Sequence, residues 1–196
     1  MRDQGGGSKV AHLSNDRWIE AGEAKRHSGC GLDWLNFFVE AVQTSFGAFA
    51  TVYLVKNDWP PQAIGLALTI ATMSSLFSQI PAGAALDSIH DKRQAVLLGI
   101  VGVGLAALLL WVTAARPAVY LALALQGLAS SLIGPGVAAI SLALVGQAAL
   151  SERIGRNARF ASIGNGLAAG TMGVAGSYLP TGSVFLVAAV LVVPAI

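Results

Sequence analysis

One carboxylate, Glu40, lies inside an apolar segment and is the side chain of this sequence best placed to do chemistry. It recurs with Asn36, Gln43, Gly47 and Thr51 at spacings of three or four residues, which predicts one face of a helix. An ionised carboxylate at such a depth is costly unless it faces water or a partner. We therefore expect Glu40 to contact a substrate or carry a proton along a polar path. The alternative is a hydrogen-bonded clasp to another helix.

Two amide side chains in later apolar segments are further candidates for this path. Gln126 lies in the fourth segment and Asn165 in the fifth. In the fourth segment, Gly134-Pro135-Gly136 predicts a helix break, because proline has no N–H to donate. The carbonyl groups freed there would line a cavity, or neighbouring helices would satisfy them and the motif would serve packing alone.

The elements that must position these side chains are six apolar segments. Hydrophobic residues make up 55% of the sequence and charged residues 11%, with a mean hydropathy of +0.66. Soluble domains have about 25% charged residues, so we expect an all-α integral membrane protein. A span needs about 20 apolar residues, which the first five segments supply and the sixth, truncated, does not. The segments are Leu32–Val55, Ala63–Leu86, Gln94–Ala114, Ala118–Val145, Phe160–Leu179 and Val184–Ile196.

Polarity in these segments follows a period of three. Segments one, two, four and five carry polar stripes, whereas segments three and six are almost free of polar residues. This pattern predicts six transmembrane helices built as two three-helix repeats. Four helices would face the polar path, and two would face the lipid bilayer.

Basic residues predict the orientation of the helices. Ten of the twelve Lys and Arg residues fall in the N-terminal tail and the second and fourth loops, while Lys56 and Arg116 lie on the other side. Cytoplasmic loops carry an excess of Lys and Arg, so we expect a cytoplasmic N-terminus and a multi-pass protein of the bacterial inner membrane. Residues 1–31 are polar and predict a disordered cytoplasmic tail without an assigned role.

Other classes of function find little support in the sequence. Cys30 is a single cysteine, and His12, His27 and His90 all lie outside the apolar segments. We therefore expect no metal site, no cofactor and no enzymatic activity, since no nucleophilic triad or paired carboxylates occur inside the spans. The net charge of +2 does not indicate nucleic-acid binding.

Two loops resemble those of the major facilitator superfamily. The second loop is similar to the family motif G-x-L-x-D-R-x-G-R-R, with Gly83, Asp87 and Lys92 at matching positions. Ser88, His90 and Asp91 depart from the motif. The fourth loop, Glu152-Arg153-Ile154-Gly155-Arg156, is similar to the E-R-x-G-R loop of many members.

A third match is less complete. Gln126-Gly127 resembles the Q-G of the family's fourth-helix motif, but Leu123 stands where the drug–proton antiporter branch has an arginine. The resemblance runs from about Leu32 to Ile196 and covers the N-terminal six-helix half of a family member, which would pair with a C-terminal half in the same or another chain. It implies a cytoplasmic gate. Its members would be Gly83, Asp87, Lys92, Arg93, Arg153 and Arg156.

The function that these features favour is secondary active transport of a small solute by alternating access, with proton coupling. The substrate-path residues would be Asn36, Glu40, Gln43, Gln126 and Asn165. The alternatives are a membrane scaffold or sensor that transports nothing, and a non-functional truncated remnant. A scaffold or sensor would explain the six spans but not why polarity is concentrated on four of them.

Overall fold

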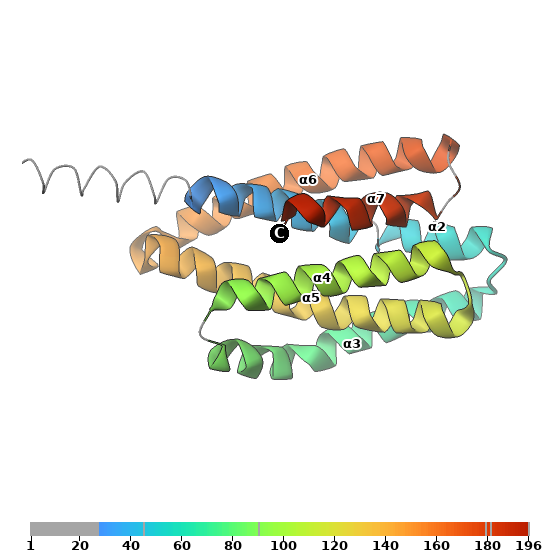
Figure 1. Cartoon of the computed structure of the whole chain (residues 1–196), viewed down its shortest axis with the longest axis horizontal. Coiled ribbons are helices and arrows are strands. Elements are labelled where there is room, and N and C mark those ends of the chain that lie inside the picture. Colours follow the sequence, from blue (N-terminus) through green and yellow to red (C-terminus); the bar gives the residue numbers. More distant parts are fainter. Residues whose placement is uncertain (1–27, 45, 90, 179, 181, 196) are drawn as a thin grey trace, which may run out of the picture.

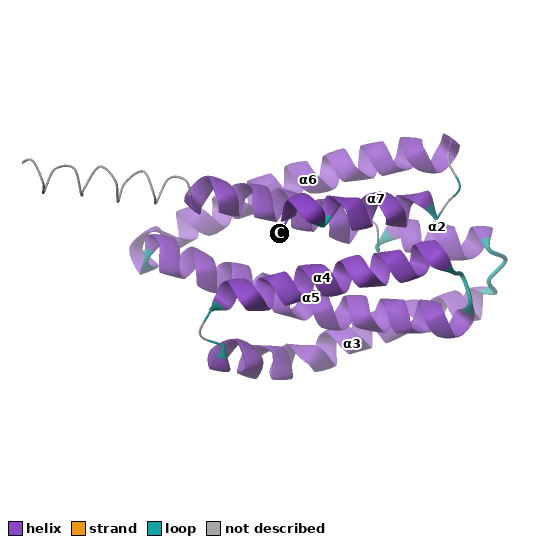
Figure 2. Ribbon diagram, viewed as in Figure 1, coloured by secondary structure: helices purple, strands orange, loops and turns teal. Residues whose placement is uncertain are grey.

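The protein is a bundle of helices, seen in a computed structural model that describes residues 28–195 apart from 45, 90, 179 and 181 (Figure 1). Every regular element in those residues is helical (Figure 2). The elements are the first helix (residues 28–44), α2 (Ala48–Lys56), α3 (Pro61–Ser88), α4 (Lys92–Val112), α5 (Arg116–Val145), η1 (Gln147–Ala149), α6 (Leu150–Tyr178), α7 (Ser183–Leu191) and η2 (Val193–Ala195).

Four stretches among the described residues are long and apolar enough to cross a membrane. They are Ser28–Lys56, Pro61–Leu86, Lys92–Val112 and Arg116–Val145. The fifth helix, α6, has 29 residues but is rich in glycine and polar side chains. The stretch Ser183–Ala195 is apolar but shorter. These helices match the first four predicted spans closely and give the last two a weaker membrane signal.

The predicted tail and the first span both differ from expectation. Residues 28–31, assigned to the tail, are already helical, and residues 1–27 lie outside the described part of the chain. The first span is interrupted after residue 44, where the backbone N–H of Phe46 donates to the carbonyl of Gln43 at 3.0 Å. A new helix, α2, then begins at Ala48. The predicted face from Asn36 to Thr51 is therefore divided between two helices.

The predicted break in the fourth span is absent. The helix α5 continues from Arg116 to Val145 with Pro135 inside it. Packing beside the proline is tight, since a Cβ on Gly136 would lie 2.5 Å from Cγ2 of Val96 on α4. The helix therefore continues through Pro135 at a place where it packs closely against α4.

Glycines allow close approach between α5 and its two neighbours. A Cβ on Gly99 of α4 would lie 2.9 Å from the carbonyl oxygen of Ala129 on α5. On the other side of α5, a Cβ on Gly127 would lie 2.4 Å from the carbonyl oxygen of Ala71 on α3. The helices α3, α4 and α5 thus form one layer, in the lower part of Figure 1.

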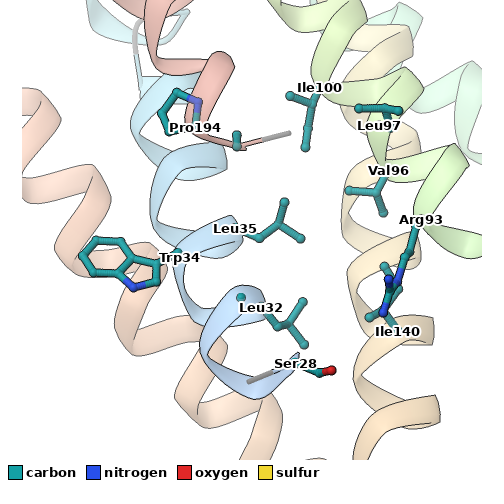
Figure 3. A pocket seen from close by; sticks show the side chains of 12 residues that line it. Ser28, Leu32, Trp34, Leu35, Arg93, Val96, Leu97, Ile100, Ile140 and Pro194 are labelled. Atoms are coloured by element: carbon teal, nitrogen blue, oxygen red, sulfur yellow. The ribbon is translucent and has the colours of Figure 1, made fainter. Parts of the chain in front are cut away.

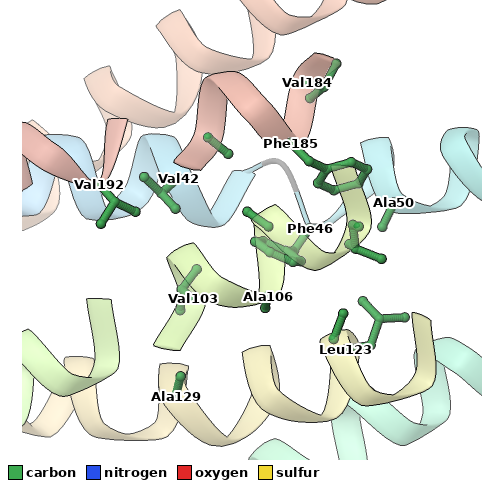
Figure 4. Close-up of a cluster of buried hydrophobic side chains, with 14 of the residues drawn as sticks. Val42, Phe46, Ala50, Val103, Ala106, Leu123, Ala129, Val184, Phe185 and Val192 are labelled. Carbon is green, nitrogen blue, oxygen red and sulfur yellow. The ribbon is translucent and has the colours of Figure 1, made fainter. Parts of the chain in front are cut away.

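The core between this layer and the remaining helices centres on Phe185 of α7 (Figure 4). Its ring lies 5.8 Å from that of Phe46 and 5.1 Å from that of Tyr53, measured between centroids. The hydroxyl group of Tyr53 donates to the carbonyl oxygen of Leu110 on α4 at 2.7 Å. Burial of these rings therefore joins α2, α4 and α7 at one end of the bundle.

The outer surfaces of α4 and α7 are apolar, as expected for helices that face lipid. From Leu97 to Val112, every exposed residue of α4 is hydrophobic. On α7 the exposed side chains are Val187 and Val190. Because exposed surfaces this apolar are unusual on soluble proteins, the bilayer is the environment that suits them.

Candidate functional site: a polar stripe and a buried ion-pair cluster

The predicted polar stripe survives on the first helix, in a shorter form. Asn36, Glu40 and Gln43 share one face and are all half-buried. The amide of Asn36 donates to the carbonyl of Leu32 in its own helix at 2.7 Å. The carboxylate of Glu40 has no hydrogen-bond or ion-pair partner among the described residues. Glu40 is thus not a clasp between helices of this part of the chain.

The two later candidates lie on different helices. Gln126 of α5 donates to the hydroxyl group of Ser130, one turn further along, at 3.1 Å. Asn165 of α6 is exposed. No hydrogen bond in the described residues joins either side chain to Glu40. The backbone of α6 nevertheless contacts the first helix, because a Cβ on Gly164 would lie 2.2 Å from the carbonyl oxygen of Phe37. Asn165 therefore lies one residue beyond this contact between the two helices.

A cavity between helices lies elsewhere in the structure. It has a volume of about 580 Å³ and separates the first helix from α4 and α5 (Figure 3). Leu32 and Leu35 face Val96 and Ile100 across it, and Arg93 is its one charged lining residue. Pro194 and Ala195, which follow α7, bound it at one end. Its lining is mostly aliphatic and excludes the polar stripe, so it is not the predicted substrate path.

The strongest polar feature of the structure is an ion-pair cluster around Asp33. This carboxylate is almost fully buried, with a side-chain exposure of 3%. One oxygen, Oδ1, accepts from Nη2 of Arg153 at 2.5 Å. The other, Oδ2, accepts from Nε and Nη2 of Arg156 at 2.9 and 2.6 Å. The first helix is thereby joined to the beginning of α6.

The cluster continues from α6 to α5. Nε of Arg153 donates to Oδ1 of Asn157 at 2.8 Å, and Nδ2 of Asn157 donates to the hydroxyl group of Ser141 at 2.8 Å. Ser141 is completely buried and donates in turn to the carbonyl of Val137. No fully buried side-chain nitrogen or oxygen among the described residues is without a hydrogen-bond partner, which favours the stability of a buried polar network.

The two arginines are in different environments. Arg153 has a side-chain exposure of 7%, whereas that of Arg156 is 54%. Arg156 also stacks over the ring of Phe160, 5.9 Å from its centroid. The hydrogen bond and charge of Asp33 raise the pKa of Arg156 above its ordinary value, so this guanidinium stays protonated at any physiological pH.

Asp33 was absent from the residues singled out in the sequence, where Arg153 and Arg156 were expected to act as gate residues. The spacing held a signal, because Asp33 precedes Glu40 by seven residues and so begins the same helical face. A single acid at the end of a span does not identify its partners, however. Only the fold shows that α6 returns to this point.

The second loop uses its polar groups to end and begin helices. The ammonium group of Lys92 donates to the carbonyls of Leu86 and Ile89, at the end of α3. Asp91 caps α4 by accepting from the backbone N–H of Arg93 at 3.0 Å. Gly83 has open space around its Cα, and the side chain of Asp87 lies outside the described structure. These contacts satisfy backbone carbonyls at the end of α3 and a backbone N–H at the start of α4. The part of this loop in gating stays a prediction.

The family of the chain follows from comparison with known proteins. A family model described as the Major Facilitator Superfamily matches residues 32–196. Two curated relatives, uncharacterised MFS-type transporters from two strains of Mycobacterium tuberculosis, are each 36% identical over 143 residues. The match covers 72% of this chain and 34% of each relative, so the chain spans about a third of their length. The chain belongs to the Major Facilitator Superfamily and is a transporter-family membrane protein.

Proposed function

We propose that this chain is the N-terminal six-helix half of a proton-coupled secondary transporter that moves a small solute by alternating access. The observation that carries the proposal is the half-buried carboxylate of Glu40, which has no partner among the described residues and lies between Asn36 and Gln43 on one face. An unpaired carboxylate in a membrane helix marks a substrate or proton pathway. Gln126 and Asn165 would add polar contacts from α5 and α6.

The proposed orientation places the N-terminus in the cytoplasm of a bacterial cell, with the chain in its inner membrane. Gly29 lies close to Arg153, and Ser28 borders the same cavity as Arg93, so these basic loops lie at the end of the bundle where the first helix begins. At the other end, Arg116 lies over the ring of Trp59. The excess of positive charge at the first end supports a cytoplasmic assignment.

The proposed partner is a second six-helix half, in the same or another chain. Support comes from α6, where Asn165, Gly166 and Gly170 are exposed and no described group lies within 4 Å of a Cβ on either glycine. Gly166 and Gly170 form a G-x-x-x-G pair, a pattern common at helix contacts in membranes, yet inside this part of the chain Gly164 makes the close contact instead. A face of small and polar residues suits a second protein surface better than lipid.

Transport by the full transporter that contains this chain tests the proposal. Purified protein would be placed in vesicles with an entrapped fluorescent pH indicator, and a panel of small solutes would be added outside. The wild type should acidify or alkalinise the lumen with at least one solute. Glu40→Gln should abolish this signal, because the amide cannot exchange a proton.

A matched control keeps this result interpretable. Glu152→Gln makes the same chemical change at an exposed acid in the first turn of α6, and it should leave transport intact. If Glu40→Gln is expressed normally and shows wild-type uptake with unchanged pH dependence, Glu40 has no part in coupling. A wild type inactive with every solute would favour a scaffold or sensor.

A further inference from the structure

The polar stripe on the first helix has a charged beginning, which is Asp33. Asp33, Asn36, Glu40 and Gln43 are separated by three, four and three residues and so share one face. Asp33 and Glu40 lie two helical turns apart, which is about 10 Å along the axis. Any rotation or shift of this helix at Asp33 is therefore passed to Glu40.

Two contacts with α6 determine the position of that face. At the beginning of the helix, Asp33 is held through both of its oxygens by arginines one turn apart on α6. One turn further, Gly164 of α6 meets the backbone of Phe37 with no space for a side chain between them. Glu40 follows less than one turn beyond the second contact.

The ion pair resists displacement more strongly than a surface pair would. Removing one member of a buried pair leaves an uncompensated charge in a medium that solvates it poorly. Arg153 is buried and bound at the same time to Asp33 and Asn157, so its guanidinium has one acceptable position. Arg156 is half exposed and binds a single oxygen. Water could therefore take over the contact of Arg156 with the Asp33 carboxylate, but it could not take over that of Arg153.

We propose that Asp33, held by Arg153, is a positioning residue for the polar stripe: the pair sets the rotation of the first helix and thereby the surroundings of Glu40. Arg156 adds charge at the rim and is not required for this role. The effect of the pair on transport rests on the proposed function, whereas its effect on the orientation of the first helix does not.

A single reporter cysteine tests the structural content without any substrate. In the full chain, in phospholipid vesicles, Cys30→Ser would remove the native thiol and Gln43→Cys would place one on the stripe. The rate of alkylation by N-ethylmaleimide then reports how exposed that face is. Asp33→Asn and Arg153→Gln should each change this rate several-fold, while Arg156→Gln should leave it at the parent value. Asp33→Glu should give an intermediate rate, because the charge is kept with a longer stem.

Some of these variants carry an uncompensated charge and could fail to fold. The double variant Asp33→Asn with Arg153→Gln removes the buried pair and leaves only the charge of Arg156, which is half exposed to water. Its alkylation rate should also differ several-fold from that of the parent. Equal rates in the parent and this double variant would overturn the proposal, and so would an effect of Arg156→Gln as large as that of Arg153→Gln.

A second readout connects the pair to Glu40 in the full transporter. Asp33→Glu should retain uptake but shift its pH profile, whereas Arg159→Gln, at an exposed arginine of the same helix outside the cluster, should leave the profile unchanged. An unchanged profile in Asp33→Glu, in a transporter that Glu40→Gln inactivates, would refute the positioning role while leaving the proposed function in place. If the alkylation rates shift as expected in a protein that transports no solute, the positioning role is supported and the proposed transport function is refuted.

Discussion

The carbonyl oxygen of Phe37 lies against the Cα of Gly164, so closely that an added Cβ would approach it to 2.2 Å. This contact joins the first helix to α6 midway between the buried ion pair of Asp33 and the carboxylate of Glu40. It is a contact between backbones, and a backbone cannot turn aside as a side chain can. The geometry of the polar stripe therefore depends on the absence of a side chain at one position.

Gly164→Ala should destabilise the chain, because one methyl group must separate two helices or distort them. Overpacking of this kind costs about 1–3 kcal/mol. The matched control is Gly65→Ala on α3, an exposed position where a Cβ meets open space. Thermal melting in detergent should show a clear loss for the first variant and none for the second. Equal melting temperatures would show that the helices separate without cost.

Gly127→Ala should act in the same way between α5 and α3. Its Cβ would lie 2.4 Å from the carbonyl oxygen of Ala71 and 3.0 Å from the backbone nitrogen of Ser75. A substitution at Gly65, exposed on α3 with no neighbouring group, serves as the comparison. Fluorescence-detected size exclusion after heating should show aggregation at lower temperature for Gly127→Ala only. This result would show that Gly127, the second residue of the Gln126-Gly127 pair, is needed for close packing of α5 against α3.

Tyr53→Phe should lower stability by about 1 kcal/mol, because it removes one hydrogen bond and keeps the buried ring. The lost bond is that from the hydroxyl group to the carbonyl of Leu110, and the carbonyl then stays without this donor. Tyr120→Phe is the control, since Tyr120 packs against Trp59 by its ring alone. Denaturant titration followed by tryptophan fluorescence would measure the free energy of unfolding of both variants. A larger loss for Tyr120→Phe would contradict a stabilising role of the Tyr53 hydrogen bond.

Lys92→Met should loosen the end of α3, because two backbone carbonyls lose a charged donor. Arg93→Met removes a positive charge from the next position, whose side chain lines the cavity and makes no hydrogen bond in the described structure. Hydrogen exchange of the α3 terminus should therefore accelerate in the first variant and stay constant in the second. Acceleration in both would point to net charge in the loop rather than to capping.

Arg153→Lys should cost more stability than Arg156→Lys, although both keep the charge. A lysine has no second donor arranged to reach Asn157 and Asp33 together, and at position 153 the side chain is buried. At position 156, which is half exposed, water replaces what the ammonium group cannot reach. Melting temperatures of the two variants, measured side by side, would reveal this order or contradict it.

Several features were determined by the sequence alone, because they depend on local composition and spacing. Apolar length placed the ends of α3, α4 and α5 within a few residues of those observed, whereas α6 begins at Leu150, ten residues before the predicted Phe160. The loop motifs around Gly83 and Glu152 indicated the family that the comparisons then showed. The helical period put Asn36, Glu40 and Gln43 on one face. The clean polarity of the third and sixth segments predicted apolar outer surfaces, which α4 and α7 have.

The tertiary structure decided everything that depends on pairing between distant segments. Asp33 and Arg153 are 120 residues apart, and no spacing rule relates them. The helix α5 continues through Pro135 where it packs closely against α4, while the first span is interrupted where Phe46 is buried against Phe185. Local propensity is a weak force in each case, and burial and charge compensation between helices outweigh it.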